Sequence, residues 1–202
     1  MGDDDDLMSR LPKGSQRDRE LNMEEIVALY AQDEVPGRVV GTARRSRVRA
    51  ENLPHAAVKI LVRDADGRIY VHRRTRTKDL YPGLHDVWVG GVIAAGEEPL
   101  SAAERELAEE LGLRGCALRP TMRHWYTDAY TNYLTYAYET LYTPGRHGPI
   151  VHQSTEVADG WWLPWRELNA QLSDPRWQFV PDGREHLIRY AAQHPESGGH
   201  HP

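Results

Sequence analysis

Short apolar runs separated by turn residues open the patterned part of the chain. Glu25–Tyr30 is followed, after a proline–glycine turn, by Val39-Val40, and this pattern predicts a β-hairpin. Ala56–Val62 and Ile69–Val71 flank Asp64-Ala65-Asp66-Gly67, where aspartate can bond the turn backbone and glycine can take a positive φ. We therefore expect a second hairpin there.

The most regular helical spacing of apolar residues covers Pro99–Leu111 and predicts a helix. Proline suits the first turn, Glu97 and Glu98 suit the positive end of the helix dipole, and Gly112 suits the exit. Ahead of this helix, Val87–Val89 predicts a short strand that runs into a pair of glycines. The segment thus reads as strand, glycine-rich turn and helix.

The rest of the chain predicts further strands and two closing helices. The strands lie around Ala117–Arg123, Tyr133–Tyr142 and Glu156–Leu163. One helix begins near Pro164, and the other covers about Arg184–Ala192. Strands mixed with helices predict an α/β sandwich. Residues 1–20 are charged without apolar periodicity and residues 195–202 are polar, so we expect disordered arms at both ends.

Composition narrows the class of protein. A chain of 202 residues that is 40% hydrophobic and 27% charged fits one globular domain with tails. Its net charge of −5 offers no basic field to nucleic acid or anionic lipid, and no apolar run approaches the roughly 18 residues of a membrane span. The N-terminus is acidic, unlike a secretory signal, and a lone Cys116 cannot form an internal disulfide. We expect a soluble, cytoplasmic protein.

Three glutamates share one face of the predicted helix. At about 100° per residue, Glu106, Glu109 and Glu110 fall within one arc of roughly 100°. The adjoining arc is apolar and must face a core; it holds Leu100, Ala103, Leu107 and Leu111. The glutamates repel one another, and their arc has no lysine or arginine. Oxygen ligands of this kind suit Mg²⁺, so these glutamates could bind a metal ion. The alternative interpretation is that they form an ordinary solvated helix face.

The segment from Gly91 to Leu113 matches the Nudix box, G-x5-E-x7-R-E-U-x-E-E-x-G-U with U aliphatic, at every fixed position. Those positions are Gly91, Glu97, Arg105, Glu106, Leu107, Glu109, Glu110, Gly112 and Leu113. From average residue usage, one window matches by chance about once in 10⁹. The preceding HRRTRTKDLYPGLHDVWVGG and the closing EVADGWWLPWREL resemble the Nudix branch that includes type I isopentenyl-diphosphate isomerase and related bacterial hydrolases. This similarity covers residues 24–192.

The resemblance implies a fold, a cofactor and a reaction. The fold is an α/β/α sandwich with a mixed sheet, the cofactor is Mg²⁺ or Mn²⁺, and the substrate is a small molecule with a diphosphate linked to another group. Glu106, Glu109 and Glu110 would bind the metal, together with the carbonyl of Gly90. Arg105 would complete the catalytic set, and it could pair with Glu97 to fix the loop against the helix. A homodimer is plausible by resemblance alone.

Several residues outside the box have two interpretations. Arg73, Arg74 and Lys78, in a basic run at a strand end, could bind the substrate's phosphates or form a solvated loop, and RNA is a weaker alternative. Trp88 could line the pocket or the core. Glu156 precedes the last sheet strand and could be a further metal ligand or base, or a surface glutamate. His152 and Glu139 are weaker candidates for the base. Core packing is the favoured interpretation for Trp161, Trp162 and Trp165.

Two other functions remain open beside hydrolysis. The isomerase needs a cysteine where this chain has Gly90, and Cys116 lies beyond the box helix, so isomerisation is disfavoured. A domain that binds a nucleotide-like ligand without turning it over is a further alternative, although such domains usually have damaged glutamates in the box. The group attached to the diphosphate does not follow from the sequence: nucleoside diphosphate sugars, dinucleoside polyphosphates, oxidised nucleotides and isoprenoid diphosphates all fit.

Overall fold

The structure is a computed structural model that describes residues 24–32 and 37–194. The predictions for residues 1–20 and 195–202 lie outside the described residues. The strands are β1 (Ile26–Tyr30), β2 (Val39–Arg44), β3 (His55–Arg63), β4 (Ile69–Arg74), β5 (His85–Asp86), β6 (Trp88–Val89), β7 (Arg119–Thr127), β8 (Asn132–Leu141) and β9 (Val157–Leu163). The helices are α2 (Arg45–Ala50), α3 (Pro99–Leu111), α4 (Pro144–His147), α5 (Trp165–Ser173) and α6 (Pro181–Gln193).

One mixed sheet organises the described part of the chain. Its strand order is β5-β4-β3-β8-β7, with β6 paired to β3 and β9 paired to β4. Only the pairing of β3 with β8 is parallel among these strand pairs. β4 pairs with β3 only where Arg63 meets Ile69, and further along β3 pairs with β6 instead. This split brings the glycine pair after β6 against the middle strand of the sheet.

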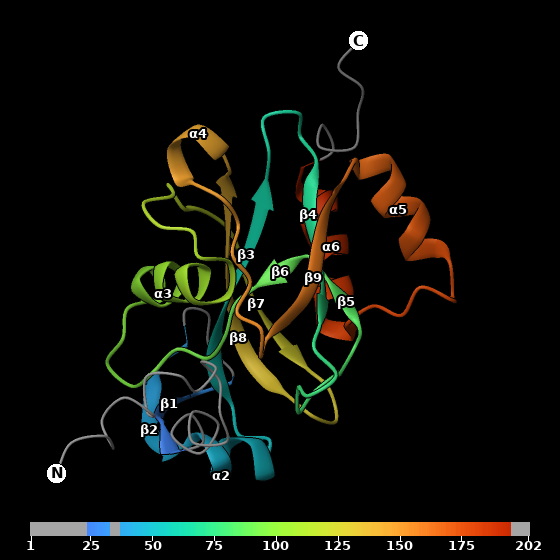
Figure 1. The fold of residues 1–202 in the computed structure, drawn as a ribbon. Helices are drawn as coiled ribbons and strands as arrows, with labels where there is room; N and C mark the ends of the chain where they lie inside the picture. Colours follow the sequence, from blue (N-terminus) through green and yellow to red (C-terminus); the bar gives the residue numbers. More distant parts are fainter. Residues whose placement is uncertain (1–23, 33–36, 195–202) are drawn as a thin grey trace, which may run out of the picture.

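Helices cover both faces of this sheet, as Figure 1 shows, with α3 on one side and α5 and α6 on the other. The α3 side buries one core cluster, which includes Val58, Ile60, Leu107 and Leu111. The opposite side buries a second cluster, which includes Leu61, Leu168, Leu187 and Tyr190. Nearly every residue of β3 is buried because both its faces are covered. The predicted α/β/α sandwich with a mixed sheet is confirmed.

Both predicted hairpins form. β1 and β2 pair antiparallel as a separate two-stranded sheet, which lies below α3 in the view of Figure 1. In the second hairpin, Asp64 Oδ1 accepts hydrogen bonds from the backbone N–H groups of Asp66 and Arg68, at 3.0 and 2.9 Å. Gly67 has a φ of 77°, as the turn requires. The local signal for this second turn was sufficient because Asp64 and Gly67, which form it, lie inside it.

Helix α3 has the predicted bounds. Pro99 stands in its first turn, and Gly112 ends it with a left-handed φ of 69°. The expected apolar arc is wrong at one position: Leu100 is 46% exposed, because the first helical turn projects beyond the core that buries Ala103 and Leu107. The buried face instead includes two of the three glutamates, Glu106 and Glu110.

Strand β5 and helix α4 were not predicted, and two further helices depart from the sequence prediction. Helix α6 begins at Pro181, three residues before the predicted Arg184, because proline serves as a first-turn residue and Gly183 packs against Asp86; a Cβ on Gly183 would lie 2.4 Å from Asp86 Oδ1. Helix α2 was not predicted, because Val48 is its only buried residue and no apolar period marks it.

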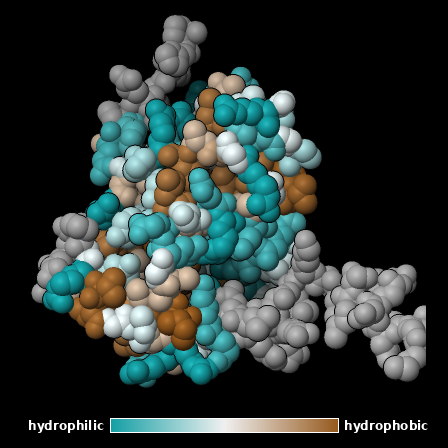
Figure 2. All heavy atoms as spheres, turned by 90° about the vertical axis from the view of Figure 1, so that its left-hand side faces the viewer, coloured by the Kyte–Doolittle hydropathy of each residue, from teal (hydrophilic) through white to brown (hydrophobic). Residues whose placement is uncertain are grey.

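The described surface of the face that carries α3 is mostly hydrophilic in Figure 2, with apolar patches in its upper part and in its lower part, where the first hairpin lies. Ile26, Val39 and Val40 of that hairpin are each about half exposed. Within the described residues, no helix is both long enough and apolar enough to cross a bilayer.

Candidate functional site

Three of the box glutamates open into one cavity of about 390 Å³, which we call the glutamate pocket. Its acidic lining residues are Glu25, Glu106, Glu109, Glu110 and Glu156. Its basic lining residues are Arg45, Lys78 and Arg105. Gly90, Gly91 and Gln153 complete the wall. The structure therefore brings together residues from α2, α3, the loop after β4, the glycine pair and the segment before β9.

The glycine pair leaves room for close contacts that a side chain would block. A Cβ on Gly90, whose φ is 155°, would lie 2.0 Å from the backbone oxygen of Val58 in β3. A Cβ on Gly91 would lie 2.3 Å from Oε1 of Glu106. Because Gly91 has no side chain, the Glu106 carboxylate rests directly on this backbone, where it is only 8% exposed.

Arg105 joins the loop before α3 to the helix. Its Nε and Nη2 donate to the two carboxylate oxygens of Glu97, at 2.9 and 3.0 Å, and Glu97 also accepts a bond from the N–H of Ala94. Nη1 of Arg105 donates to Glu106 at 2.7 Å. The hydrogen bonds to Glu97 are the main reason that the pKa of Arg105 is raised, so the guanidinium stays charged. The predicted pairing of Arg105 with Glu97 is confirmed.

Burial decides the electrostatics of the pocket. It raises the pKa of Glu110 to about 7, with the positive charge of Lys78 opposing the change. Burial also raises the pKa of Glu106, against the influence of Arg105. Burial and the charge of Arg74 lower the pKa of Lys78 to about 8. Burial thus favours the protonated forms of Glu106 and Glu110, and a bound cation would stabilise their charged forms.

The expectation that the glutamates lack basic neighbours is wrong in three dimensions. Lys78 pairs with Glu156, Arg45 donates to Glu25 at 2.8 Å, and Arg105 reaches Glu109 at 3.4 Å. Helical spacing can reveal Arg105, which lies four residues before Glu109 on the same helix, but not Lys78 and Arg45, which come from distant segments. Neither Glu25 nor Arg45 was predicted as a site residue. Glu25 precedes β1 and Arg45 begins α2, and no local signal marks the packing of either against the pocket.

The donor set fits a hard divalent cation, since the pocket is lined by carboxylates and contains neither cysteine nor histidine. In the arrangement seen, however, no three acidic, histidine or cysteine side chains of the described residues converge closely enough to hold an ion. Glu106 and Glu109 are turned toward Arg105, and Glu156 is turned toward Lys78. A bound cation would have to take these carboxylates from their basic partners.

A second, smaller cavity of about 120 Å³ adjoins the first, and we call it the basic cavity. It shares Arg45, Lys78, Gly90 and Gly91 with the glutamate pocket. Arg74 lines it, with Nε and Nη2 donating to the backbone oxygen of Leu80 at 3.3 and 3.0 Å. Two of the predicted phosphate-binding residues, Arg74 and Lys78, therefore lie at this site.

The other two predicted substrate-binding residues do not line either cavity. Arg73 faces away from Arg74, because side chains alternate along β4, and it pairs with Asp159 at 2.5 Å. Trp88 is 2% exposed within the second core cluster, where its Nε1 donates to the backbone oxygen of Gly183 at 3.1 Å. Packing, rather than ligand contact, accounts for Trp88.

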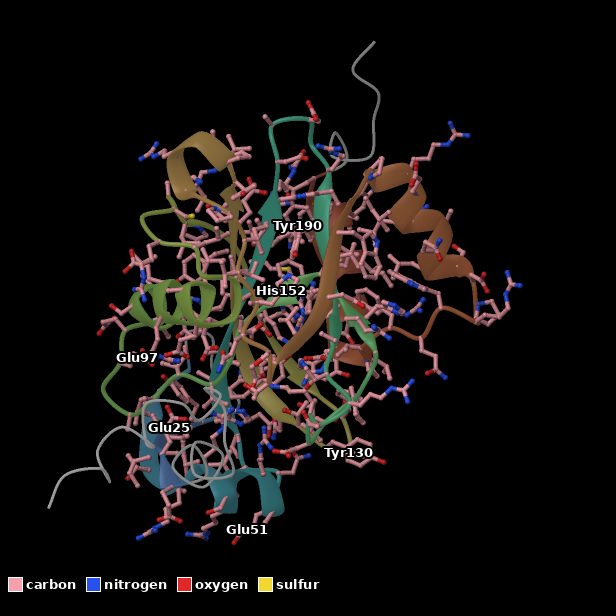
Figure 3. The ribbon with its side chains drawn as sticks, in the orientation of Figure 1. Glu25, Glu51, Glu97, Tyr130, His152 and Tyr190 are labelled. Atoms are coloured by element: carbon pink, nitrogen blue, oxygen red, sulfur yellow. The ribbon has the colours of Figure 1, made fainter. Side chains whose placement is uncertain are left out.

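The weaker base candidates also lie outside the glutamate pocket. Nε2 of His152 is 2.5 Å from the hydroxyl of Tyr70. Glu139 bonds to Arg119 and Tyr190, and Figure 3 shows Tyr190 in the upper half of the molecule, well above Glu25 and Tyr130. Cys116 is buried in the first core cluster. Trp161, Trp162 and Trp165 pack against the cores, as expected.

Comparison with known proteins agrees with this geometry. Residues 53–183 match the NUDIX domain model. The chain is 42% identical to an uncharacterised Nudix hydrolase, orf19, of Rhodococcus erythropolis over 83% of this chain and 92% of that protein. It is 36% identical to an uncharacterised Nudix hydrolase, YfcD, of Escherichia coli over 74% of this chain and 78% of that protein.

Solved structures show the same fold. The crystal structure of DR0079 from Deinococcus radiodurans superposes with a TM-score of 0.66, at 24% identity, over 82% of this chain and 98% of that chain. The NUDIX domain of Shewanella oneidensis NrtR, solved with ADP ribose, superposes with a TM-score of 0.54, at 18% identity, over 69% of this chain and 87% of that chain.

Proposed function

The chain belongs to the Nudix hydrolase family and is a pyrophosphohydrolase acting on acid anhydrides; from that premise we propose that it cleaves a nucleoside-diphosphate-type or related organic diphosphate at the glutamate pocket, with Mg²⁺ or Mn²⁺. The observation that carries this proposal is the gathering of five glutamates and three basic residues in one cavity. Such a mixture suits a site that must hold both a dication and the phosphates it neutralises.

In this proposal Glu106, Glu109 and Glu110 hold the cation, with the Gly90 carbonyl and Glu156 as additional oxygen donors. When bound, the cation polarises the phosphoryl group and neutralises its charge. The carboxylates left around it orient the attacking water and accept its proton. Burial of Glu106 and Glu110 supports this role, because fixed charges act more strongly where water is excluded.

The basic residues have separate tasks. Arg105 is a positioning residue, since its bidentate bond to Glu97 fixes the loop and its third contact aims the Glu106 carboxylate. Arg45, Lys78 and Arg74 line the route from the glutamate pocket to the basic cavity, where they would bind phosphate oxygens. Binding of a dication would release Lys78 from Glu156, which frees the ammonium for the substrate.

The test is a screen of organic diphosphates with and without Mg²⁺ or Mn²⁺, reading released phosphate or nucleotide. We expect turnover that excess chelator abolishes and added metal restores. Glu110→Gln should remove it, whereas Glu104→Gln, an exposed glutamate of the same helix that does not line the pocket, should not. Full turnover in excess chelator, or equal loss in both variants, would contradict the assignment.

A further inference from the structure

A segment that precedes the residues matched by the family model supplies one wall of the site. The NUDIX domain model begins at residue 53, whereas β1, β2 and α2 all end before it. In Figure 1 these three elements lie together below α3. Glu25, just before β1, and Arg45, the first residue of α2, both line the glutamate pocket, and Arg45 also lines the basic cavity. Both residues therefore bring a charge to the proposed site from outside the family model.

This segment is attached to the loop that leads from the box glycine to α3. The backbone N–H of Ala95 in that loop donates to the backbone oxygen of Ile26 at 2.8 Å, and Val27 forms an isolated β-bridge with Ala94. Val27 is also buried in a small core cluster, and Val92 of the loop packs against that cluster. These contacts set the position of the segment beside the glutamate pocket.

Two hydrogen bonds join Arg45 to Glu25. The backbone N–H of Arg45 donates to the backbone oxygen of Glu25 at 2.8 Å, and its Nη1 donates to Oε2 of the Glu25 side chain, also at 2.8 Å. The two side chains are 14% and 25% exposed, respectively. Because both ends of the arginine are held, its side chain has less rotamer freedom to lose when it binds an anion. Glu25 thus sets where the guanidinium lies.

The guanidinium of Arg45 lies where a diphosphate would pass from one cavity to the other. Arg45, Lys78 and the glycine pair are the residues that the glutamate pocket and the basic cavity share. The charge of Arg45 also reaches α3, since burial raises the pKa of Glu106 and the charges of Arg105 and Arg45 oppose that rise. A planar guanidinium matches the spacing of phosphate oxygens, so this position suits contact with a diphosphate whose metal is held by the box glutamates.

We propose that Arg45 binds the substrate's diphosphate where the two cavities meet, and that Glu25 is the positioning residue that holds Arg45 there. The inference rests on the proposed function and gives tasks in it to two residues outside the family model. Glu25 lines the same pocket as the box glutamates, so the alternative is that it binds the cation itself. The two roles differ in how a Glu25 variant depends on Arg45 and on the metal.

The first test measures the binding of methylenediphosphonate, a diphosphate analogue whose P–C–P linkage resists hydrolysis, by calorimetry with saturating Mg²⁺. Arg45→Met should raise Kd about tenfold or more, because a charge-assisted bond to phosphate is lost. Arg45→Lys keeps the charge without the planar fork and should raise Kd less. Glu25→Gln should raise Kd severalfold, because the neutral amide no longer holds the guanidinium in place.

Three outcomes of this test overturn the inference. The first is no binding of the diphosphonate to wild type, and the second is a wild-type Kd in Arg45→Met. The third is tighter binding in Glu25→Gln, which would show that the carboxylate only repels the phosphates.

A double variant separates positioning from metal binding. If Glu25 acts through Arg45, Glu25→Gln should have no further effect on Kd in the Arg45→Met background. Mn²⁺ affinity, measured by calorimetry without the diphosphonate, should stay within about fivefold of wild type in Glu25→Gln, whereas loss of a metal ligand should lower it by about tenfold or more. Multiplied losses in the double variant, or the larger loss of Mn²⁺ affinity, contradict the positioning role.

Arg47 and Glu51 offer a matched control pair at the same helix. They bond at 2.9 Å, their side chains are 63% and 49% exposed, and they line neither cavity. Figure 3 shows Glu51 at the lower edge of the molecule, with Glu25 between it and Glu97. Arg47→Met and Glu51→Gln should leave Kd unchanged, and losses equal to those at Arg45 and Glu25 would contradict the inference. If the screen finds no hydrolysed diphosphate, the proposed function fails, while the binding data still decide the tasks of Arg45 and Glu25.

Discussion

Replacing Gly91 by alanine tests whether the position of one carboxylate controls turnover. The new Cβ would lie 2.3, 2.6 and 2.9 Å from Oε1, Cδ and Oε2 of Glu106. Ordinary van der Waals contact begins at 3.4 Å, so Oε1 must retreat by about 1.1 Å, the difference between 3.4 and 2.3. Only the far end of a side chain has to move, and the backbone need not.

A displacement of this size has a defined cost. A misplacement of about 1 Å in a catalytic constellation can lower the rate by about 10²-fold. We therefore expect Gly91→Ala to lower kcat by about two orders of magnitude, to weaken activation by Mn²⁺, and to leave the melting temperature within a few degrees of wild type.

The assay is steady-state kinetics at saturating substrate over a Mn²⁺ titration, with thermal unfolding measured on the same samples. Gly41→Ala is the matched control, because nothing lies within 4 Å of a Cβ at that position. Gly90→Ala is the contrasting case: its Cβ would lie 2.0 Å from a backbone oxygen of β3, so it should unfold at a lower temperature. Wild-type kcat in Gly91→Ala would refute the argument that Glu106 acts from its place on this backbone.

Three further outcomes follow from the described residues. Glu110→Gln should lower kcat by roughly 10²-fold or more, because it removes a charge that opposes the cation, and a folded variant with wild-type kcat would place the site elsewhere. His55 and His72 are buried with pKa values lowered by burial to about 4 and about 3; the unfolded chain binds their protons first as pH falls below about 6.5, so stability should fall by about 1.4 kcal/mol per pH unit for each. Urea titrations at pH 7 and pH 5 measure this loss, and equal midpoints would contradict it. Cys116→Ala should leave kcat/KM intact, since its thiol is buried in the core away from the pocket.

Local patterns predicted the elements that carry their own boundary signals. Helix α3, the turn at Asp64–Gly67 and the Glu97–Arg105 pairing all depend on residues a few positions apart, and all three are present. The glutamate face could likewise be predicted from helical spacing, because Glu106, Glu109 and Glu110 share one arc.

The long-range contacts of the site could not be predicted from the sequence in the same way. Arg45 and Lys78 reach the glutamates from segments about 60 and 30 residues away, and no periodicity records that approach. Alternation along β4 separates Arg74 from Arg73, but the sequence could not say which of the two faced the cavity. Trp88 was ambiguous because a residue on a buried strand just before the glycine pair can face either the pocket or the core.

The central claim is metal-dependent attack of water on a diphosphate at the glutamate pocket. The most direct measurement follows turnover in deuterated, ¹⁸O-labelled water with Mg²⁺, for wild type and for Glu110→Gln, and analyses the products by mass spectrometry. The account predicts one solvent oxygen on one phosphate product of wild type and loss of that signal in the variant. Conversion of isopentenyl diphosphate with deuterium on carbon and no labelled phosphate would contradict it.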